Sequence, residues 1–403
     1  MWSLAVLLLL LQATDPNEEG RKALEAQDYA AAARHFALAA QADPKDYTAL
    51  FHLALANSML NKDEEAIRDY RKVLELKPGL YQAELNLGIL LLRQKRPAEA
   101  IPTLEKAAAA KPGEYRARYY MGEALLAAGE YEKAAAHFTA ALEANPKSSE
   151  AELGMARSLA RQNRLADAVP HFVKAAALDP AFEDVLLELA GLYEKAGERA
   201  EAIAIYERFP GNVAAQERLG ELLMEDKKYA EAIPRLEEAY RKDPTPANRV
   251  ALAAAHLFNK EPEKALPLLE QAAAADASNY DIRMMYARAL RDAKRYGYAT
   301  REFLEATRIK PDSREAWKDL AAMLYLTGNL PQSLAALDRA QKLGDDSPAI
   351  HYFRAITLDK MRELPAALES YRKFLAGSQG KNPDEEFKAR QRARIIEKEL
   401  SKR

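Results

Sequence analysis

The sequence predicts an all-α fold, an α-solenoid of about eleven 34-residue helix-turn-helix repeats followed by a C-terminal capping helix. Three observations predict it. An alanine recurs at intervals of 34 residues, apart from one interval of 30 and one of 33. A Gly or Ala lies twelve residues before each of these positions, and a large apolar residue lies four residues after. Because a solenoid grows by adding units, the length of 403 residues counts repeats rather than separate globular cores.

The first element is an apolar leader at residues 1–12, with an unbroken leucine run from Leu7 to Leu11. It has about half of the roughly 20 apolar residues that a membrane-spanning helix needs. This length is typical of the apolar region of a secretory signal, so we expect an exported or periplasmic protein. If the leader stays uncleaved, it is the expected point of membrane contact. The alternatives are a leader helix packed on the first repeat and a cytoplasmic protein.

The second element is the repeat array, residues 13–381, in which three positions recur in every unit. The alanine slot holds Ala32, Ala66, Ala100, Ala134, Ala168, Ala202, Ala232, Ala265, Ala299, Ser333 and Ala367. The small slot, twelve residues earlier, holds Gly20, Ala54, Gly88, Gly122, Ala156, Ala190, Gly220, Ala253, Ala287, Ala321 and Ala355. The large slot, four residues after the alanine, holds Phe36, Tyr70, Leu104, Phe138, Phe172, Tyr206, Leu236, Leu269, Phe303, Leu337 and Tyr371.

These slots predict two amphipathic helices in each unit, joined by a polar turn such as Gly129-Glu130. Small residues that face each other let the two helix backbones approach closely, and the large residue fills the space beside the contact. Prolines twelve residues after the alanine slot, such as Pro78 and Pro146, are expected to end the second helix. A further set is expected in the first turn of the second helix, where a missing N–H costs little: Pro102, Pro170, Pro234 and Pro267.

The last elements are a break in the array and a cap. The sixth unit is short and closes in the sequence Phe209-Pro210-Gly211-Asn212, so we predict a bend near 209–212 between halves 1–208 and 213–403. Residues 382–403 are predicted to form a capping helix. Its apolar face would hold Ala389, Ala393, Ile396 and Leu400, with the basic side chains on a solvated face.

The composition argues against catalysis. The chain has no cysteine, which excludes disulfides, thiolate metal sites and a cysteine nucleophile. His35, His137 and His171 share one slot in different units, so their separations are multiples of the period and too long for one metal ion to bridge. No phosphate-binding glycine loop, metalloprotease helix or nucleophile elbow is present. We therefore expect no catalytic residue, no metal site, no cofactor and no enzymatic activity.

The pattern resembles the tetratricopeptide repeat, a pair of antiparallel helices in 34 residues. In the fourth unit, the positions that carry the resemblance are Met121, Gly122, Leu125, Ala134, Phe138, Ala141 and Pro146. In the tenth unit they include Trp317, Leu320, Ala321, Leu324, Leu337 and Ala340. The resemblance implies a right-handed superhelix whose concave side is lined by the first helix of each unit and binds segments of partner proteins.

Carrying the concave positions of this family over to the sequence gives the candidate partner-binding residues. They are Phe51, His52, Asn86, Ile89, Arg116, Tyr119, Tyr120, Glu123, Arg157, Arg161, Arg288, Arg291, Tyr325 and Tyr352, with Glu188 and Lys195 in equivalent slots. Aromatic and arginine side chains dominate protein interfaces, so Arg116, Tyr119 and Tyr120 form the strongest predicted cluster. Some relatives grip a terminal carboxylate with a polar clamp. Asn86 and Arg116 match two of its parts, whereas Phe51 and Tyr120 do not.

Taken together, the residues predict a non-enzymatic scaffold, exported, that binds other proteins or peptide segments and aids the assembly of a multiprotein complex. One alternative is a repeat subunit of a larger enzyme or of a secretion machine. Another is a helical-repeat RNA binder. The net charge of −2 disfavours that last interpretation because nucleic-acid binders usually carry a basic excess, so we expect no nucleic acid partner.

Overall fold

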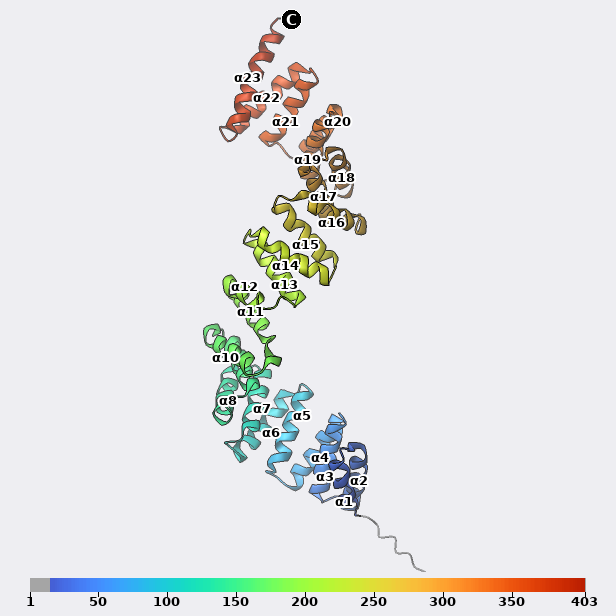
Figure 1. The fold of residues 1–403 in the computed structure, drawn as a ribbon, viewed down its shortest axis with the longest axis vertical. Helices are drawn as coiled ribbons and strands as arrows, with labels where there is room; N and C mark the ends of the chain where they lie inside the picture. The colour runs from blue at the N-terminus through green and yellow to red at the C-terminus, as the bar shows by residue number, and fades with distance from the viewer. Residues whose placement is uncertain (1–14, 403) are drawn as a thin grey trace, which may run out of the picture. The chain divides into compact units, whose positions relative to one another are not determined.

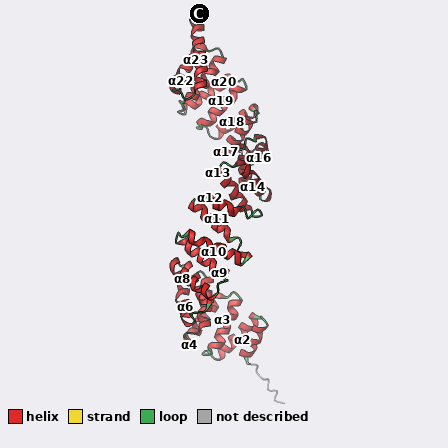
Figure 2. Ribbon diagram, turned by 60° about the vertical axis from the view of Figure 1, so that its left-hand side comes forward, coloured by secondary structure: helices red, strands yellow, loops and turns green. Residues whose placement is uncertain are grey.

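The computed structural model describes residues 15–402, which form 23 α-helices and one short 3₁₀ helix (Pro180–Phe182), and this stretch contains no strand (Figures 1 and 2). The predicted all-α fold is confirmed. The leader, residues 1–12, lies outside the described residues. None of the helices in the described stretch has both the length and the apolar character that crossing a membrane requires.

The first 22 helices form eleven consecutive pairs, as the slots predict. The first helices of the pairs are α1 (Pro16–Glu25), α3 (Tyr47–Met59), α5 (Tyr81–Arg93), α7 (Tyr115–Ala127), α9 (Ser149–Arg161), α11 (Val185–Ala196), α13 (Val213–Glu225), α15 (Pro246–Phe258), α17 (Tyr280–Asp292), α19 (Arg314–Leu326) and α21 (Pro348–Lys360). The second helices are α2 (Tyr29–Ala42), α4 (Asp63–Leu76), α6 (Pro97–Ala110), α8 (Tyr131–Ala144), α10 (Leu165–Leu178), α12 (Arg199–Tyr206), α14 (Tyr229–Lys242), α16 (Pro262–Ala275), α18 (Tyr296–Ile309), α20 (Leu330–Lys342) and α22 (Leu364–Ser378). The chain ends in α23 (Pro383–Leu400).

Within each pair, a residue in the left-handed region ends the first helix. In the third unit this residue is Lys95, at φ 56°. Its N–H donates to the carbonyl of Leu92, and the N–H of Arg96 donates to the carbonyl of Leu91. These two hydrogen bonds satisfy carbonyls that the end of the helix leaves without an intrahelical partner. The same position is left-handed in all eleven units: Gln27, Asn61, Lys95, Gly129, Asn163, Gly197, Lys227, Lys260, Lys294, Gly328 and Arg362.

Many first helices begin at a side chain that caps them. Ser148 Oγ accepts from the N–H of Ala151, and Ser313 Oγ accepts from the N–H of Ala316, which satisfies amide groups that lack an intrahelical partner. Each of these serines is also 2.6 Å from the hydroxyl of a tyrosine that opens the preceding first helix, Tyr115 in one case and Tyr280 in the other. The cap therefore also links neighbouring units.

The alanine slot lies at the contact between the two helices of each unit, as predicted. None of its eleven residues exposes any surface. The one exception to alanine, Ser333, shows what the slot faces. Its hydroxyl donates to the carbonyl oxygen of Ala321 at 2.8 Å, and Ala321 is the small-slot residue of the same unit. The two small series therefore face each other, and the serine's polar group is satisfied where it is buried.

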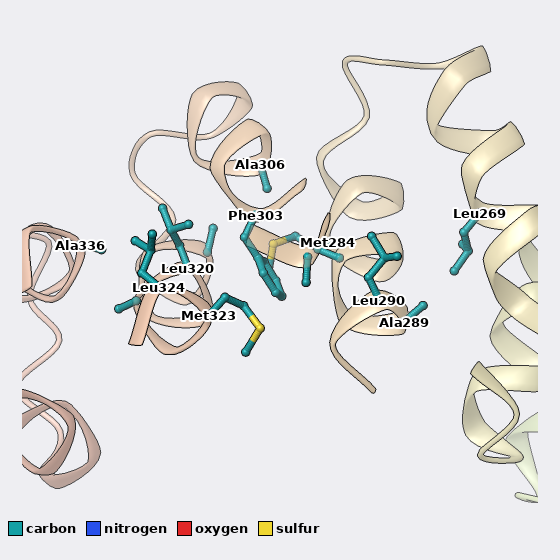
Figure 3. Close-up of a cluster of buried hydrophobic side chains, with 14 of the residues drawn as sticks. Leu269, Met284, Ala289, Leu290, Phe303, Ala306, Leu320, Met323, Leu324 and Ala336 are labelled. Atoms are coloured by element: carbon teal, nitrogen blue, oxygen red, sulfur yellow. The ribbon is translucent and has the colours of Figure 1, made fainter. Parts of the chain in front are cut away.

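The large slot fills the space that the small slot leaves. A Cβ atom added to Gly122 would lie 2.8 Å from the ring of Phe138, and one added to Gly154 of the next unit would lie 2.4 Å from the same ring. Phe138 is fully buried between these two glycines. In the cluster of the second half, Figure 3 shows Phe303 beside Met284, directed into the space between successive helix pairs.

The prediction that a set of prolines lies in the first turn of the second helix was wrong. Pro102 is the sixth residue of α6, inside the helix, because α6 begins three residues before the alanine slot. The carbonyl four residues earlier, on Ala98, loses its helical donor. Both Pro102 and Ala98 are exposed, so water can satisfy that carbonyl. The same displacement applies to Pro170, Pro234 and Pro267, each the sixth residue of its helix.

The sixth unit departs from the others, and the chain divides there into two compact units, one ending at Ala202 and the other beginning at Ile203. Its second helix, α12, has only 8 residues. The loop after it is tied to α13 by the buried amide of Gln216, whose Nε2 donates to the carbonyl of Phe209 at 3.1 Å. The predicted bend at 209–212 concerns the orientation of the two units and stays a prediction.

The C-terminal helix α23 packs against α22 with the predicted face. Ala389, Ala393 and Ile396 are buried in a cluster with Phe374, and Leu400 packs at its edge. The basic residues of α23 are less uniformly solvated than expected. Arg392 contacts Asp359 of α21 through Nε and Nη2, at 2.6 and 2.8 Å, and so helps to dock the cap.

Candidate partner-binding surface

All the candidate partner-binding residues lie on first helices, so they belong to one face of their unit, which we call the first-helix face. Phe51 and His52 are on α3, Asn86 and Ile89 on α5, and Arg116, Tyr119, Tyr120 and Glu123 on α7. Arg157 and Arg161 are on α9, Arg288 and Arg291 on α17, Tyr325 on α19 and Tyr352 on α21. The structure brings only some of them together, in four separate places.

The predicted tyrosine cluster forms on α7. The ring of Tyr119 stacks on Tyr115 with centroids 5.7 Å apart and meets Tyr120 edge-on at 5.0 Å. The ring of Tyr119 also packs on that of Phe138 in the core, with ring centroids 6.1 Å apart. Burial raises the pKa of the Tyr119 phenol. Tyr120 is half-buried and Arg116 is exposed. Burial also raises the pKa of the Glu123 carboxyl, and the Arg157 charge offsets part of that rise.

The residues nearest the N-terminus pack against large-slot side chains of the first two units. His52 stacks on Phe36 with ring centroids 5.0 Å apart, and burial lowers its pKa, which favours the neutral ring. Phe51 meets the ring of Tyr70 edge-on at 5.5 Å. The amide of Asn86 donates to the hydroxyl of Tyr70 at 3.0 Å, so this part of the carboxylate clamp is already engaged within the chain. Their part in partner binding stays a prediction.

One hollow on the first-helix face is the α7–α11 groove, of about 860 Å³, which runs over α7, α9 and α11. It contains two candidates, Arg157 and Arg161, and its lining includes Leu126, Leu187, Leu192 and Lys195. Arg157 Nη2 pairs with Glu188 Oε2 across the groove at 2.9 Å. By contrast, Arg161 and Lys195 are exposed and pair with no carboxylate in the described part of the chain.

The aliphatic residues that line this groove were not predicted from the sequence. Leu126, Leu187 and Leu192 have the same side chain as leucines that pack between units, and their sequence spacing does not separate the two roles. One signal was present: Gly191 breaks the apolar pattern of α11. A Cβ added to Gly191 would meet nothing within 4 Å, which fits an open groove rather than a helix crossing.

A second hollow, the α15–α19 groove of about 440 Å³, contains Arg288 and Arg291. Both are neutralised within the chain. Arg288 Nη2 pairs with Asp319 Oδ2 at 3.2 Å and with Glu315, and Arg291 Nε pairs with Asp292 Oδ1 at 2.9 Å. Phe258, at the edge of this groove, is 59% exposed and stacks on Tyr229. This groove therefore offers apolar surface without a free positive charge.

Tyr325 and Tyr352 line a third hollow, of about 460 Å³, between α19, α21, α22 and the cap α23. The ammonium of Lys360 lies 4.9 Å from the ring centroid of Tyr325, a cation–π contact. The ring of Tyr352 packs on Phe374 at 4.9 Å. Capping the array thus creates a pocket to which α23, an element outside the repeats, contributes Lys388 and Arg392.

The described residues hold no group of three or more His, Cys, Asp or Glu side chains placed to bind a metal ion. Three histidines lie beside carboxylates instead. His171 Nδ1 lies 2.5 Å from Glu152, His256 Nδ1 lies 2.9 Å from Glu261, and His351 Nε2 lies 2.8 Å from Asp346. His256 Nε2 also lies 3.9 Å from Glu237 Oε1, but each hydrogen bond joins a histidine to one carboxylate, which is typical of structural pairs rather than of a coordination site.

Comparison with known proteins identifies the repeat. Two family models match the chain, and both are described as tetratricopeptide repeat. The first matches residues 17–81, 85–149 and 204–247. The second matches residues 159–223 and 259–324. No curated protein matches the chain.

Solved structures with similar folds each cover about two fifths of the chain. One is MamA, residues 41 to the end, from Desulfovibrio magneticus RS-1, with 25% identity over 41% of this chain and 94% of that one, at a TM-score of 0.40. A second MamA structure is 22% identical to this chain, and the match covers 43% of this chain and 94% of that one. Its TM-score is 0.39. YrrB, described as a TPR protein with an unusual peptide-binding site, is 20% identical to this chain. The match covers 40% of this chain and 83% of that one, at a TM-score of 0.38.

Proposed function

The chain belongs to the tetratricopeptide repeat family, and we propose that it is a non-enzymatic scaffold that binds segments of partner proteins in the α7–α11 groove. One observation carries the proposal. The groove combines aliphatic side chains, Leu126, Leu187 and Leu192, with two positive charges, Arg161 and Lys195, that have no carboxylate partner within the described residues. An extended segment with an acidic residue next to a large apolar one would satisfy both features.

The test uses the full chain against a displayed library of random peptides. We expect the recovered peptides to combine Asp or Glu with Leu, Ile or Phe. The double variant Arg161→Glu, Lys195→Glu should weaken their binding at least about tenfold, because it puts negative charge where the peptide carries its own. A matched control is Lys45→Glu, Lys147→Glu, which changes net charge equally at two exposed residues in turns after second helices. Binding that is insensitive to the first variant, or recovered peptides that lack acidic residues, would overturn the proposal.

We further propose that the leader, residues 1–12, directs export and that the scaffold acts in a multiprotein complex outside the cytoplasm. The support is the length and apolar character of the segment. Cell fractionation followed by N-terminal sequencing tests it. A mature chain that lacks the leader in an exported fraction is the expected result, and a chain that begins at Met1 in the cytosol contradicts it.

A further inference from the structure

One buried slot carries an unsatisfied carboxylate. Four residues before the small slot, eight units have a polar side chain, and seven of these are bonded within the chain. Arg118 and Trp317 donate to the carbonyls of Pro112 and Pro311, Gln216 donates to that of Phe209, and Arg249 donates to the hydroxyl of Tyr240. Glu152, Arg283 and His351 contact His171, Glu302 and Asp346.

The eighth is Glu84, on α5. Only 3% of its surface is exposed, and its Oε2 has no hydrogen-bond partner. Arg283 of the same slot also has a buried atom without a partner, Nε, but its Nη1 pairs with Glu302, so within the described stretch Glu84 is the one polar residue of the slot whose side chain forms no bond. Burial raises the pKa of its carboxyl, while the charge of Lys106 acts in the opposite direction. A buried carboxylate without a partner costs free energy, so a bound cation would stabilise it.

The fifth unit shows what fills this slot when it is complete. Glu152 is 1% exposed, and its two oxygens lie 2.5 Å from His171 Nδ1 and 2.5 Å from Lys174 Nζ. These partners follow Glu152 by 19 and 22 residues. In the third unit, the same offsets from Glu84 lead to Thr103 and Lys106. Thr103 donates to the carbonyl of Glu99 instead, and Lys106 is exposed and forms no ion pair in the part of the chain that the structure describes.

The space beside Glu84 is open. A pocket of about 400 Å³ lies between the end of α4, the turn that follows it, α5 and α6, which succeed one another in the blue part of Figure 1. Its walls are aliphatic, from Leu74, Pro78, Ala109 and Ala110, and it also reaches Glu84 and Lys106. Most of these residues belong to second helices or to the turn between units, so the pocket lies apart from the first-helix face.

We propose that this pocket, the Glu84 pocket, binds a primary ammonium group on an alkyl chain, such as a lysine side chain presented by a partner. The ammonium would donate to Glu84 in the way that Lys174 donates to Glu152, and the alkyl stem would pack on Leu74, Pro78 and Ala110. A single carboxylate with no second acidic or imidazole group fits an ammonium better than a metal ion.

The test measures binding to the full chain by ligand-observed NMR titration with three probes: Nα-acetyl-lysine N-methylamide, its norleucine counterpart, and 1,5-diaminopentane. We expect the lysine amide to bind and the neutral norleucine amide not to bind. Glu84→Gln should weaken binding at least about tenfold, since a charge-assisted hydrogen bond is lost. Glu152→Gln, in the slot that is already filled, should leave binding unchanged. Tighter binding of the diamine than of the lysine amide would identify a free amine as the source.

Thermal unfolding gives a readout that does not depend on the probes. Without ligand, Glu84→Gln should unfold at the same or a higher temperature because it removes an unpaired buried charge, whereas Glu152→Gln should unfold at a lower one. Three results would overturn the proposal: equal binding of the norleucine amide, binding that survives Glu84→Gln, and binding that appears only in Lys106→Met. The last would mean that Lys106 itself occupies the pocket in solution.

Discussion

At the residue scale, the fit between one aromatic ring and two glycines decides how closely neighbouring units approach. Phe138 is enclosed by Gly122 of its own unit and Gly154 of the next, and the space of a Cβ at either glycine is already taken by ring atoms. Interiors are packed densely enough that one added methyl group is felt. The small slot is therefore a shape requirement set by the large slot, which explains why the two recur together.

This fit predicts that Gly154→Ala destabilises the chain by on the order of 1–3 kcal/mol, because the new methyl group overlaps the ring of Phe138. Urea unfolding followed by circular dichroism measures the change. The matched control is Gly191→Ala, also within a first helix, where the added Cβ meets nothing within 4 Å. The control should be neutral or stabilising by up to about 1 kcal/mol, since alanine favours helix. Equal effects of the two substitutions would show that the ring of Phe138 does not limit how closely Gly154 of the next unit can approach.

A second residue-scale prediction concerns pH. Burial lowers the pKa of His52 below its ordinary value of 6.5. The unfolded chain therefore takes up the proton first, so this histidine's contribution to stability is complete above pH 6.5 and falls as the pH drops below it. Glu84, Glu123 and Asp69 have raised pKa values and act in the opposite direction.

The quantity to measure is therefore the difference in free energy of unfolding between the wild type and the His52→Phe variant. This variant keeps an aromatic ring against Phe36. Between roughly pH 7.5 and pH 5.5, the variant should gain stability relative to the wild type as the pH falls. A constant difference across that range would show that His52 titrates alike in the folded and unfolded chain.

At the element scale, the eleven turns within the units share one conformation but not one residue. Three hold glycine at the left-handed position, two hold asparagine, and the others hold lysine, glutamine or arginine. Non-glycine residues adopt this conformation at a cost, mainly because Cβ approaches a carbonyl oxygen. The other slots of the sequence predicted a polar turn at this place, but its conformation was not predicted because the residue types vary from unit to unit.

This turn predicts that Lys95→Gly stabilises the chain by about 0.5–1 kcal/mol, the relief of strain less the entropy that glycine adds to the unfolded chain. Lys77, just after α4, is the control because its φ of −135° is negative, so its side chain does not carry the strain of a left-handed residue. Lys77→Gly should destabilise by about 0.5–1 kcal/mol through the entropy term alone. Denaturant midpoints measure both, and a Lys95→Gly chain less stable than the wild type would contradict the turn geometry.

The helix boundaries show where sequence reasoning reached its limit. The periodic slots locate every helix pair, because a residue buried at each repeat leaves a period that survives substitution. They do not locate the first residue of a helix, and so Pro102 was placed in the first turn although it is the sixth residue of α6. The candidate surface follows the same division. The period predicts which helix carries each candidate. It does not predict that leucines line the α7–α11 groove or that Glu84 has no hydrogen-bond partner, because those properties depend on side-chain contacts that do not repeat.

At the scale of the whole molecule, the sixth unit interrupts an otherwise regular array. In a repeat protein each unit is stabilised by its neighbours, so the array unfolds together only as far as that coupling extends. The second helix of the sixth unit has 8 residues, against 13 to 15 in the other second helices, and so has less apolar surface with which to couple neighbours. The chain divides within this same helix, between Ala202 and Ile203.

We therefore expect the two compact units to unfold in separate transitions. Trp317 lies in the second unit, with its indole N–H bonded to the carbonyl of Pro311, and the other tryptophan, Trp2, can be replaced in Trp2→Phe. In that background, Trp317 fluorescence follows the second unit alone, while circular dichroism follows both. Adding Gly154→Ala should shift part of the dichroism transition to lower urea and leave the fluorescence transition in place. A fluorescence midpoint that moves with the substitution would mean that coupling passes through the sixth unit despite its short helix.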